Sequence, residues 1–339
     1  MLYLILFPLV VIAGLLVFLA IQPGEVRVRR SLVMRCTPEA AFDLVRDLGR
    51  WPDWSPRLLH EPDAERTSSD APDAAGGWYA WNGQLIGAGR VTQVALHPPE
   101  RIERRIAFQR PFKFKGAVTW EFAATAQDGT PATEVFWIMR GRMPFLLRFL
   151  APMFSQFVDK DFELGLVRLR ALLDPAAPKL NIRFPGAAEL PAQSALTLPF
   201  EGGMDDMIRA MEAGFPRLAG VLAARGIEPA GPPFTAYHMA HPKADRFRCD
   251  IAIPVPPDTA PGELTLKHFA GGLFEVTEVQ GSYDFMALAW HTATGHLRMA
   301  KRQWDRARPA LEIYATGPDR AASDDALLTR ICVPVKAKG

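Results

Sequence analysis

The feature that most constrains this chain is a duplicated segment in its C-terminal half. The sequence Asp-Ile-Ala-Ile-Pro-Val at 250–255 returns in altered form as Arg-Ile-Cys-Val-Pro-Val at 330–335. Upstream of each copy lies a strand-like segment ending in a tyrosine, Tyr237 in the first and Tyr314 in the second, and each follows a helix-length stretch. One such strand–helix–strand–strand unit cannot bury its apolar face alone, so we expect the two copies to pair.

The two copies differ in one respect that bears on function. Only the second has a carboxylate, Glu312, two residues before its tyrosine. Residues i and i+2 of a strand share one face, so Glu312 and Tyr314 are predicted to project together. Pairing of the copies leaves a groove along a pseudo-two-fold axis, and small ligands bind in grooves.

Length and composition set the broad class. A chain of 339 residues predicts about two domains, and 49% apolar with 22% charged residues is ordinary for globular protein. A net charge of +2 gives no drive toward nucleic acid, and no helix-turn-helix or zinc-finger spacing is present. The three cysteines, Cys36, Cys249 and Cys332, are too scattered for a disulfide framework and indicate reduced thiols in a cytosolic setting.

The N-terminus begins with an uncharged apolar run, Met1–Ile21. At ~1.5 Å per residue it would reach about 30 Å, the thickness of a bilayer core, so we expect a transmembrane anchor at 1–22. A cleaved signal peptide is the alternative, but the run has no basic start and no small-x-small cleavage site. Arginines follow the run and no charged residue precedes it, which predicts a single-pass protein of the inner membrane with cytoplasmic domains. These arginines are Arg27, Arg29, Arg30 and Arg35.

Residues 25–174 read as an α+β domain. An alternating edge strand at 27–34 is followed by a helix start with Thr37 as cap and Pro38 at the first helical position. A long final helix at 153–173 has one apolar stripe. Between them lie strand candidates, for which we expect a curved antiparallel sheet around the long helix: 77–82, 87–96, 101–108, 116–124 and 134–141.

Several motifs in this region occur in a familiar order. They are Trp-Pro-Asp-Trp-Ser-Pro at 51–56, Gly-x-Tyr-x-Trp-x-Gly at 77–83, Gly-Ala-Gly at 87–89 and Asp-Phe-Glu-x-Gly-Leu at 161–166. With them the domain resembles the SRPBCC superfamily (START-like or polyketide-cyclase-like, helix-grip), in particular its bacterial branch with an N-terminal membrane helix. The resemblance implies a deep apolar cavity and ligand binding or transfer more often than chemistry. Arg57 departs from the pattern, where an aromatic or small residue is expected.

Few residues of this domain suggest chemistry. We interpret Asp159, Asp161 and Glu163 of the long helix as a solvated face paired with Lys160 and Arg168. The tryptophans are core or cavity wall, and spacing does not decide which: Trp78, Trp81, Trp120 and Trp137. Apolar segments with basic residues at 111–115 and 143–154 are a strand end and a helix start, or alternatively a contact with lipid.

A proline- and alanine-rich stretch at 174–179 marks the domain boundary. Residues 179–337 resemble the GyrI-like small-molecule-binding domain, which is also the effector-binding (AraC-type) module of multidrug-responsive regulators. The resemblance rests on Gly-Ser-Tyr-Asp at 281–284, Glu-x-Tyr at 312–314 and the two Pro-Val endings. It implies that Glu312, with Tyr314 beside it, faces the groove and meets lipophilic cations. No DNA-reading domain accompanies it.

The expected site is therefore a carboxylate ringed by aromatics. Such a carboxylate is costly to leave unpaired, and a bound cation relieves the cost by charge and by contact with ring faces. The predicted ligand-binding residues are Glu312, Tyr314, Tyr237, Phe274, Tyr283, Trp290 and Trp304. The alternative is a solvent-exposed Glu312, or one paired to Arg306 or Arg308. The histidines form no metal site, and we assign no cofactor and no catalytic residue.

The predicted architecture is thus α+β: a transmembrane helix, a helix-grip domain and a duplicated βαββ GyrI-like domain. The predicted function is a membrane-anchored, non-enzymatic protein that sequesters or senses lipophilic, cationic small molecules. One alternative is a hydrolase or cyclase acting on a lipophilic or electrophilic compound, with Glu312 as general base. Another is a lipid-transfer module that works at the bilayer.

Overall fold

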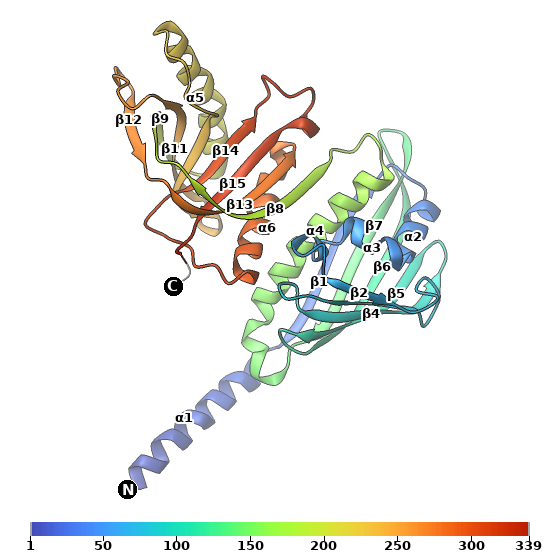
Figure 1. Ribbon diagram of the computed structural model, residues 1–339. Coiled ribbons are helices and arrows are strands. Elements are labelled where there is room, and N and C mark those ends of the chain that lie inside the picture. The colour runs from blue at the N-terminus through green and yellow to red at the C-terminus, as the bar shows by residue number, and fades with distance from the viewer. Residues whose placement is uncertain (1, 338–339) are drawn as a thin grey trace. The chain divides into compact units, whose positions relative to one another are not determined.

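The computed structural model describes residues 2–337, and their side chains except those of residues 2–6, 8 and 9. The chain divides into two compact units, Met1–Ala177 and Pro178–Gly339, each built on one antiparallel sheet (Figure 1). We call them unit 1 and unit 2. Both are α+β, as the strand and helix patterns predict.

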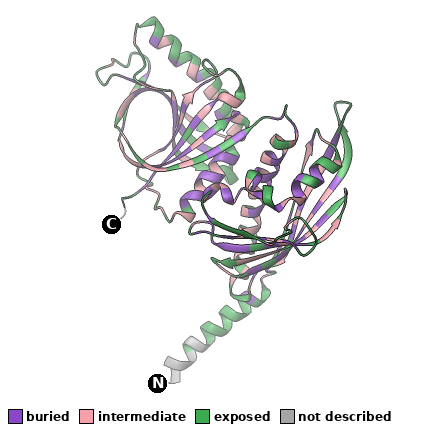
Figure 2. Ribbon diagram, turned by 45° about the vertical axis from the view of Figure 1, so that its right-hand side comes forward, coloured by how far each residue is buried: buried purple, intermediate pink, exposed green. Residues whose placement is uncertain are grey.

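The N-terminal helix α1, Leu2–Ile21, requires a correction of the predicted architecture. Among the residues that the structure describes, no helix is both long and apolar enough to cross a membrane, so the predicted transmembrane element is wrong. In this helix the side chains of Val10–Ile21 are described without interruption. Figure 2 shows this part as almost entirely exposed. The predicted interaction with a bilayer is therefore unsupported. The predicted location in the inner membrane stays a prediction.

The sheet of unit 1 has seven strands in the order β1-β7-β6-β5-β4-β3-β2. The strands are β1 Glu25–Met34, β2 Glu65–Ser68, β3 Trp78–Asn82, β4 Ala88–His97, β5 Arg101–Arg110, β6 Phe114–Gln127 and β7 Thr130–Arg142. The predicted edge strand is β1. The sequence did not reveal β2, because its four residues are all exposed and polar and lack the apolar alternation of the other strands.

Six helical segments of the described chain accompany this sheet. Helix α2, Pro38–Arg46, begins at Thr37, whose hydroxyl accepts from the Ala40 amide at 3.3 Å. Short helical turns follow at α3 Trp51–Trp54, η1 Leu48–Arg50, η2 Leu58–His60 and η3 Phe145–Leu150. The long helix α4, Ala151–Leu173, then packs its buried stripe on the sheet. The core of unit 1 lies between α4, α2 and one sheet face.

Helix α4 approaches the sheet closely at Gly165. A Cβ at this position would lie 2.6 Å from the Trp137 ring of β7. The Trp137 ring cannot move aside, because it is stacked between Phe162 at 3.9 Å and Trp120 at 4.4 Å. Gly165 is therefore required by packing.

The sheet of unit 2 has eight strands in the order β12-β9-β11-β10-β14-β15-β13-β8. They are β8 Leu180–Leu190, β9 Gln193–Gly202, β10 Phe234–His241, β11 Arg246–Val255, β12 Thr265–Phe269, β13 Gly272–Gly281, β14 Ala310–Thr316 and β15 Leu328–Pro334. Two long helices, α5 Met204–Ala224 and α6 Met286–Met299, and the turns η4 Pro242–Ala244, η5 Tyr283–Phe285 and η6 Asp324–Ala326 complete it. Strand β9, beside prolines, was not anticipated.

The duplication is visible in the strand pairing. The first copy is β9-α5-β10-β11 and the second is β13-α6-β14-β15, and β10 pairs with β14 where the copies meet. A shift of 77 residues carries Thr235 onto Glu312 and Tyr237 onto Tyr314. Thr235 and Glu312 are also paired directly across the two strands. The pseudo-two-fold axis therefore passes through this pair, in the middle of the sheet.

The two faces of this sheet differ. On one face, α5 lies against β11, where Gly214 approaches Ile251, and α6 places Trp290 over Glu312. The other face carries a separate apolar cluster that includes Phe234, Leu311 and Cys332. Glu312 and Tyr314 consequently project toward the helices.

The close approach at Gly165 gives a stability prediction. Gly165→Ala should lower the free energy of unfolding of unit 1 by about 1–3 kcal/mol, because the added methyl overpacks the Trp137 stack. Denaturant unfolding of the full chain followed by tryptophan fluorescence measures this, since six of the eight tryptophans lie in unit 1. Gly220→Ala on α5 is the matched control, as nothing lies within 4 Å of its Cβ position. A Gly165→Ala protein as stable as the control would contradict the packing argument.

Candidate functional site

Glu312 is the centre of the candidate site in unit 2. Its side chain is buried, with the residue 4% exposed, on the helix-covered face of β14. Three neutral groups donate hydrogen bonds to it. The Trp290 indole donates to Oε2 at 2.6 Å, the Tyr314 hydroxyl to Oε1 at 2.8 Å and the Tyr237 hydroxyl to Oε2 at 3.4 Å. The carboxylate is thus held by groups without a positive charge.

The arginines that offered an alternative partner lie elsewhere. The Arg306 guanidinium stacks on the Trp304 ring at 3.9 Å. Arg308 pairs with Asp305 at 2.9 Å and donates to backbone carbonyls. Among residues 2–337, Glu312 takes part in no ion pair. The geometry matches neither an exposed nor an arginine-paired carboxylate.

Burial determines the electrostatics of this cluster. It raises the pKa of Glu312 above the ordinary 4.5, and the hydrogen bonds from Trp290, Tyr314 and Tyr237 oppose the shift only in part. Burial, and after it the nearby Glu312 charge, also raises the pKa of Tyr237 and Tyr314 well above the usual range. The site thus disfavours the bare negative charge of Glu312.

Aromatic rings from both helices enclose the carboxylate. The Tyr314 ring meets Phe215 of α5 edge-on at 5.2 Å and Tyr283 at 5.6 Å. The Tyr237 ring meets Trp290 of α6 at 5.5 Å. Of the predicted aromatic residues, the structure therefore brings Tyr314, Tyr237, Tyr283 and Trp290 together around Glu312.

Three residues of this cluster were missed by the sequence analysis. Phe215 and Met211, which lies 3.9 Å from the Tyr314 hydroxyl, are one turn apart on α5, and Thr235 lies 3.1 Å from the same hydroxyl. The four-residue spacing of Met211 and Phe215 could have placed them on one helix face. Which strand that face covers depends on the tertiary fold.

Two predicted ligand-binding residues lie away from Glu312. Phe274 is 2% exposed in the apolar cluster on the opposite face of the sheet. Trp304 forms an isolated β-bridge with Val335 and stacks with Arg306. Neither contacts the carboxylate.

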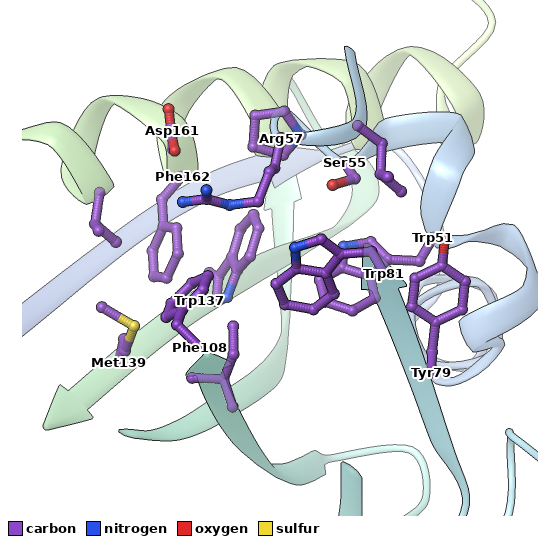
Figure 3. A pocket seen from close by; sticks show the side chains of 14 residues that line it. Trp51, Ser55, Arg57, Tyr79, Trp81, Phe108, Trp137, Met139, Asp161 and Phe162 are labelled. Atoms are coloured by element: carbon purple, nitrogen blue, oxygen red, sulfur yellow. The ribbon is translucent and has the colours of Figure 1, made fainter. Parts of the chain in front are cut away.

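Unit 1 contains a cavity of about 60 Å³ between the sheet, residues 51–58 and α4 (Figure 3). Six of its fourteen lining residues are aromatic, and the walls are formed by Trp51, Ser55, Pro56, Arg57, Leu58, Tyr79, Trp81, Ile106, Phe108, Trp137, Met139, Val158, Asp161 and Phe162. The structure shows the position of each of the four tryptophans that spacing left undecided between core and cavity wall. Trp81 and Trp137 are cavity wall, Trp120 is buried core, and Trp78 is half-buried beneath the Arg90 guanidinium.

Asp161 corrects another expectation, because it lines this cavity and is not part of a solvated face. Its neighbours on α4 do form surface ion pairs, Asp159 with Arg30 and Glu163 with Lys160 at 2.7 Å. Successive side chains of an α-helix are about 100° apart around its axis. Asp161, two residues from Asp159 and from Glu163, therefore points away from both. Burial raises the pKa of Asp161 to about 7, against the lowering effect of the Arg57 charge.

Arg57, the departure from the expected motif, forms the other polar part of the cavity. Its Nη1 donates to the Ile86 carbonyl at 3.2 Å, and its guanidinium lies 4.8 Å from the centre of the Phe108 ring. Figure 3 shows Arg57 extending toward Asp161 and Phe162 of α4. Within the described part of the chain, no group of three or more His, Cys, Asp or Glu residues could hold a metal ion.

An aromatic shell around a few ionisable groups is typical of sites for small organic molecules. The comparisons with known families agree with this class. Residues 25–174 match the family described as polyketide cyclase / dehydrase and lipid transport, and residues 188–336 match the GyrI-like small molecule binding domain. The chain thus carries a polyketide-cyclase-like (SRPBCC-like) domain and a GyrI-like domain, which indicate small-molecule binding. Both predicted domain resemblances are confirmed, without the membrane helix.

Solved structures of low similarity were also found. Protein CV1439 from Chromobacterium violaceum is 16% identical, with a TM-score of 0.33, over 45% of this chain and 99% of that chain. The EcmrR C-terminal domain is 16% identical, with a TM-score of 0.39, over 48% and 99%. SAV2435 bound to tetraphenylphosphonium is 11% identical, with a TM-score of 0.35, over 47% and 93%. A search of curated proteins found no match.

The raised pKa of Glu312 predicts how its contribution to stability changes with pH. The folded state holds this proton more tightly than the unfolded chain, so the contribution is largest below pH 4.5 and falls as the pH rises through the folded-state pKa. Glu312→Gln lacks this titration. Its stability relative to the wild type should therefore increase with pH in that window, by at most about 1.4 kcal/mol per unit.

Urea unfolding at several pH values, with hydrogen exchange of the β14 amides as the readout, measures this difference in stability. Other titrating groups cancel in the comparison of variant with wild type. A difference that stays constant between pH 4 and pH 8 would show that the carboxylate is not desolvated.

Proposed function

We propose that unit 2 binds a lipophilic, cationic small molecule, with Glu312 as the counter-charge. The observation that carries the proposal is the buried carboxylate whose three hydrogen-bond donors are all neutral. A charge buried in this way is costly unless it is paired. A ligand cation in contact with Glu312 would remove that cost.

The surroundings of Glu312 support an organic cation. The rings of Tyr237, Tyr314 and Trp290 can contact the ligand through their faces, which attract cations. A carboxylate has about four acceptor positions, and three are used here, which leaves one for a hydrogen bond to a ligand. Trp290 is only half-buried and comes from α6, so its side chain is the part that would move to admit a ligand.

We further propose that the chain sequesters or senses such compounds and does not transform them. Each unit carries its own aromatic site, which suits binding. A role in lipid transfer receives less support, because a cavity of about 60 Å³ in unit 1 is too small for an acyl chain.

Hydrolysis is the second candidate function. A carboxyl group whose pKa is raised by burial is suited to act as general base near neutral pH, and Glu312 has this property. In that case Glu312 would activate water against a lipophilic electrophile.

Binding of tetraphenylphosphonium to the full chain tests the main proposal. Glu312→Gln should raise its Kd about tenfold or more, since a charge-assisted contact contributes about 1.5–3 kcal/mol. Affinity for the wild-type protein should also increase with pH until the raised pKa of Glu312 is passed, because the cation binds the ionised form. Calorimetric titration measures both effects.

Glu278→Gln is the matched control, since Glu278 pairs with Arg330 on the same sheet and lies outside the aromatic cluster. It should bind like the wild type. Triphenylphosphine oxide, which has similar rings without a charge, should bind more weakly and respond little to Glu312→Gln. Equal affinity of wild type and Glu312→Gln for the cation would remove Glu312 from the site.

Incubation with styrene oxide separates the second candidate from the first. A binding protein should give no diol above the buffer rate. Turnover that is present in the wild type and in Glu278→Gln, but at least 100-fold lower in Glu312→Gln, would establish Glu312 as a general base instead. Product formation is measured by chromatography.

A further inference from the structure

The cavity of unit 1 has more hydrogen-bond donors than acceptors in its wall. Trp51, Trp81 and Trp137 are 9%, 5% and 6% exposed, and their indole Nε1 atoms have no acceptor within hydrogen-bond distance among the described residues. Buried polar groups are normally paired, so three unpaired donors at one cavity are unusual. A ligand with acceptor atoms would satisfy them.

Arg57 adds a positive charge to this wall. Of its five N–H groups, the structure assigns one hydrogen bond, from Nη1 to the Ile86 carbonyl. The one carboxylate in the wall is Asp161, and no described carboxylate oxygen lies within 4.0 Å of the guanidinium. Arg57 is thus not neutralised by a close ion pair.

The size and shape of the cavity limit the ligand. About 60 Å³ corresponds to about four to six water positions at ~10–15 Å³ each, which is close to one aromatic ring with a small substituent. The walls are flat rings: Trp51, Tyr79 and Trp81 lie together at one end of the cavity in Figure 3, and Phe162 lies toward Arg57. Rings of this kind favour a planar ligand.

We propose that unit 1 holds a second ligand site of opposite charge preference, which takes a small planar aromatic anion such as an aromatic carboxylate. Its ring lies among the tryptophans and its anionic group accepts hydrogen bonds from Arg57. The indole N–H groups supply further donors, and Asp161 in its protonated form donates one more. This site goes beyond the cation site proposed for unit 2.

Calorimetric titration of the full-length Glu312→Gln chain, in which the cation site proposed for unit 2 is removed, with benzoate, benzamide and benzylammonium tests this assignment. The three probes share one ring and differ in charge. Benzoate should bind at least tenfold more tightly than benzylammonium, with neutral benzamide between them. Benzylammonium binding as tightly as benzoate would overturn the proposal.

Substitution of Arg57 separates the contribution of its charge to benzoate binding from the contribution of its packing. Arg57→Met keeps an unbranched side chain but removes the guanidinium that lies over Phe108. It should weaken benzoate binding at least tenfold while changing benzamide binding less than threefold. Arg57→Lys keeps the charge and should retain the preference for benzoate. A loss in Arg57→Met that is equal for benzoate and benzamide, or no loss at all, would overturn the role of Arg57.

Two controls isolate the site. Arg168→Met removes another arginine near the cavity, whose Nη2 donates to the Asp53 carbonyl and which does not line it, and it should leave benzoate binding unchanged. Glu312→Gln should also leave benzoate binding unchanged, since it belongs to unit 2. Failure of the anion site is thereby distinguishable from failure of the cation site. Thermal unfolding of Arg57→Met and Arg57→Lys shows whether each variant is folded.

Discussion

The burial of the Glu312 carboxylate, with no positively charged partner among the described residues, is the constraint on which the proposed function rests. Neutral donors hold both of its oxygens, and rings from two helices exclude water from them. Hydrogen bonds from an indole and two phenols orient a carboxylate but do not cancel its charge. In the proposed function, an unbalanced charge of this kind is what would select a cation in an otherwise aromatic site.

The duplicated fold explains how one chain builds such an enclosure. Each copy contributes a strand at the centre of the sheet and a helix over the same face, so Phe215 from α5 and Trp290 from α6 lie on either side of the axis. The copies supply equivalent tyrosines, Tyr237 and Tyr314, but different residues at the axis itself. The equivalent tyrosines of the two repeats thus form part of the wall around Glu312. The difference between Thr235 and Glu312 supplies the carboxylate.

Part of this arrangement could be predicted from the sequence. Strand alternation placed Glu312 and Tyr314 on one face, and the repeat indicated which strands meet. Phe274 was misplaced because the face that a strand residue occupies depends on the register of β13, which no local pattern reveals. Asp161 was misjudged for a similar reason, since only the packing of α4 shows which acidic residue faces the cavity.

The position of the Thr235–Glu312 pair on the pseudo-two-fold axis has a consequence for stoichiometry. A site that lies off such an axis is copied by the symmetry and occurs twice, once for each repeat. A site on the axis is its own copy, so a ligand bound there would be shared by the two repeats. The proposed site at Glu312 would accordingly take one ligand per chain.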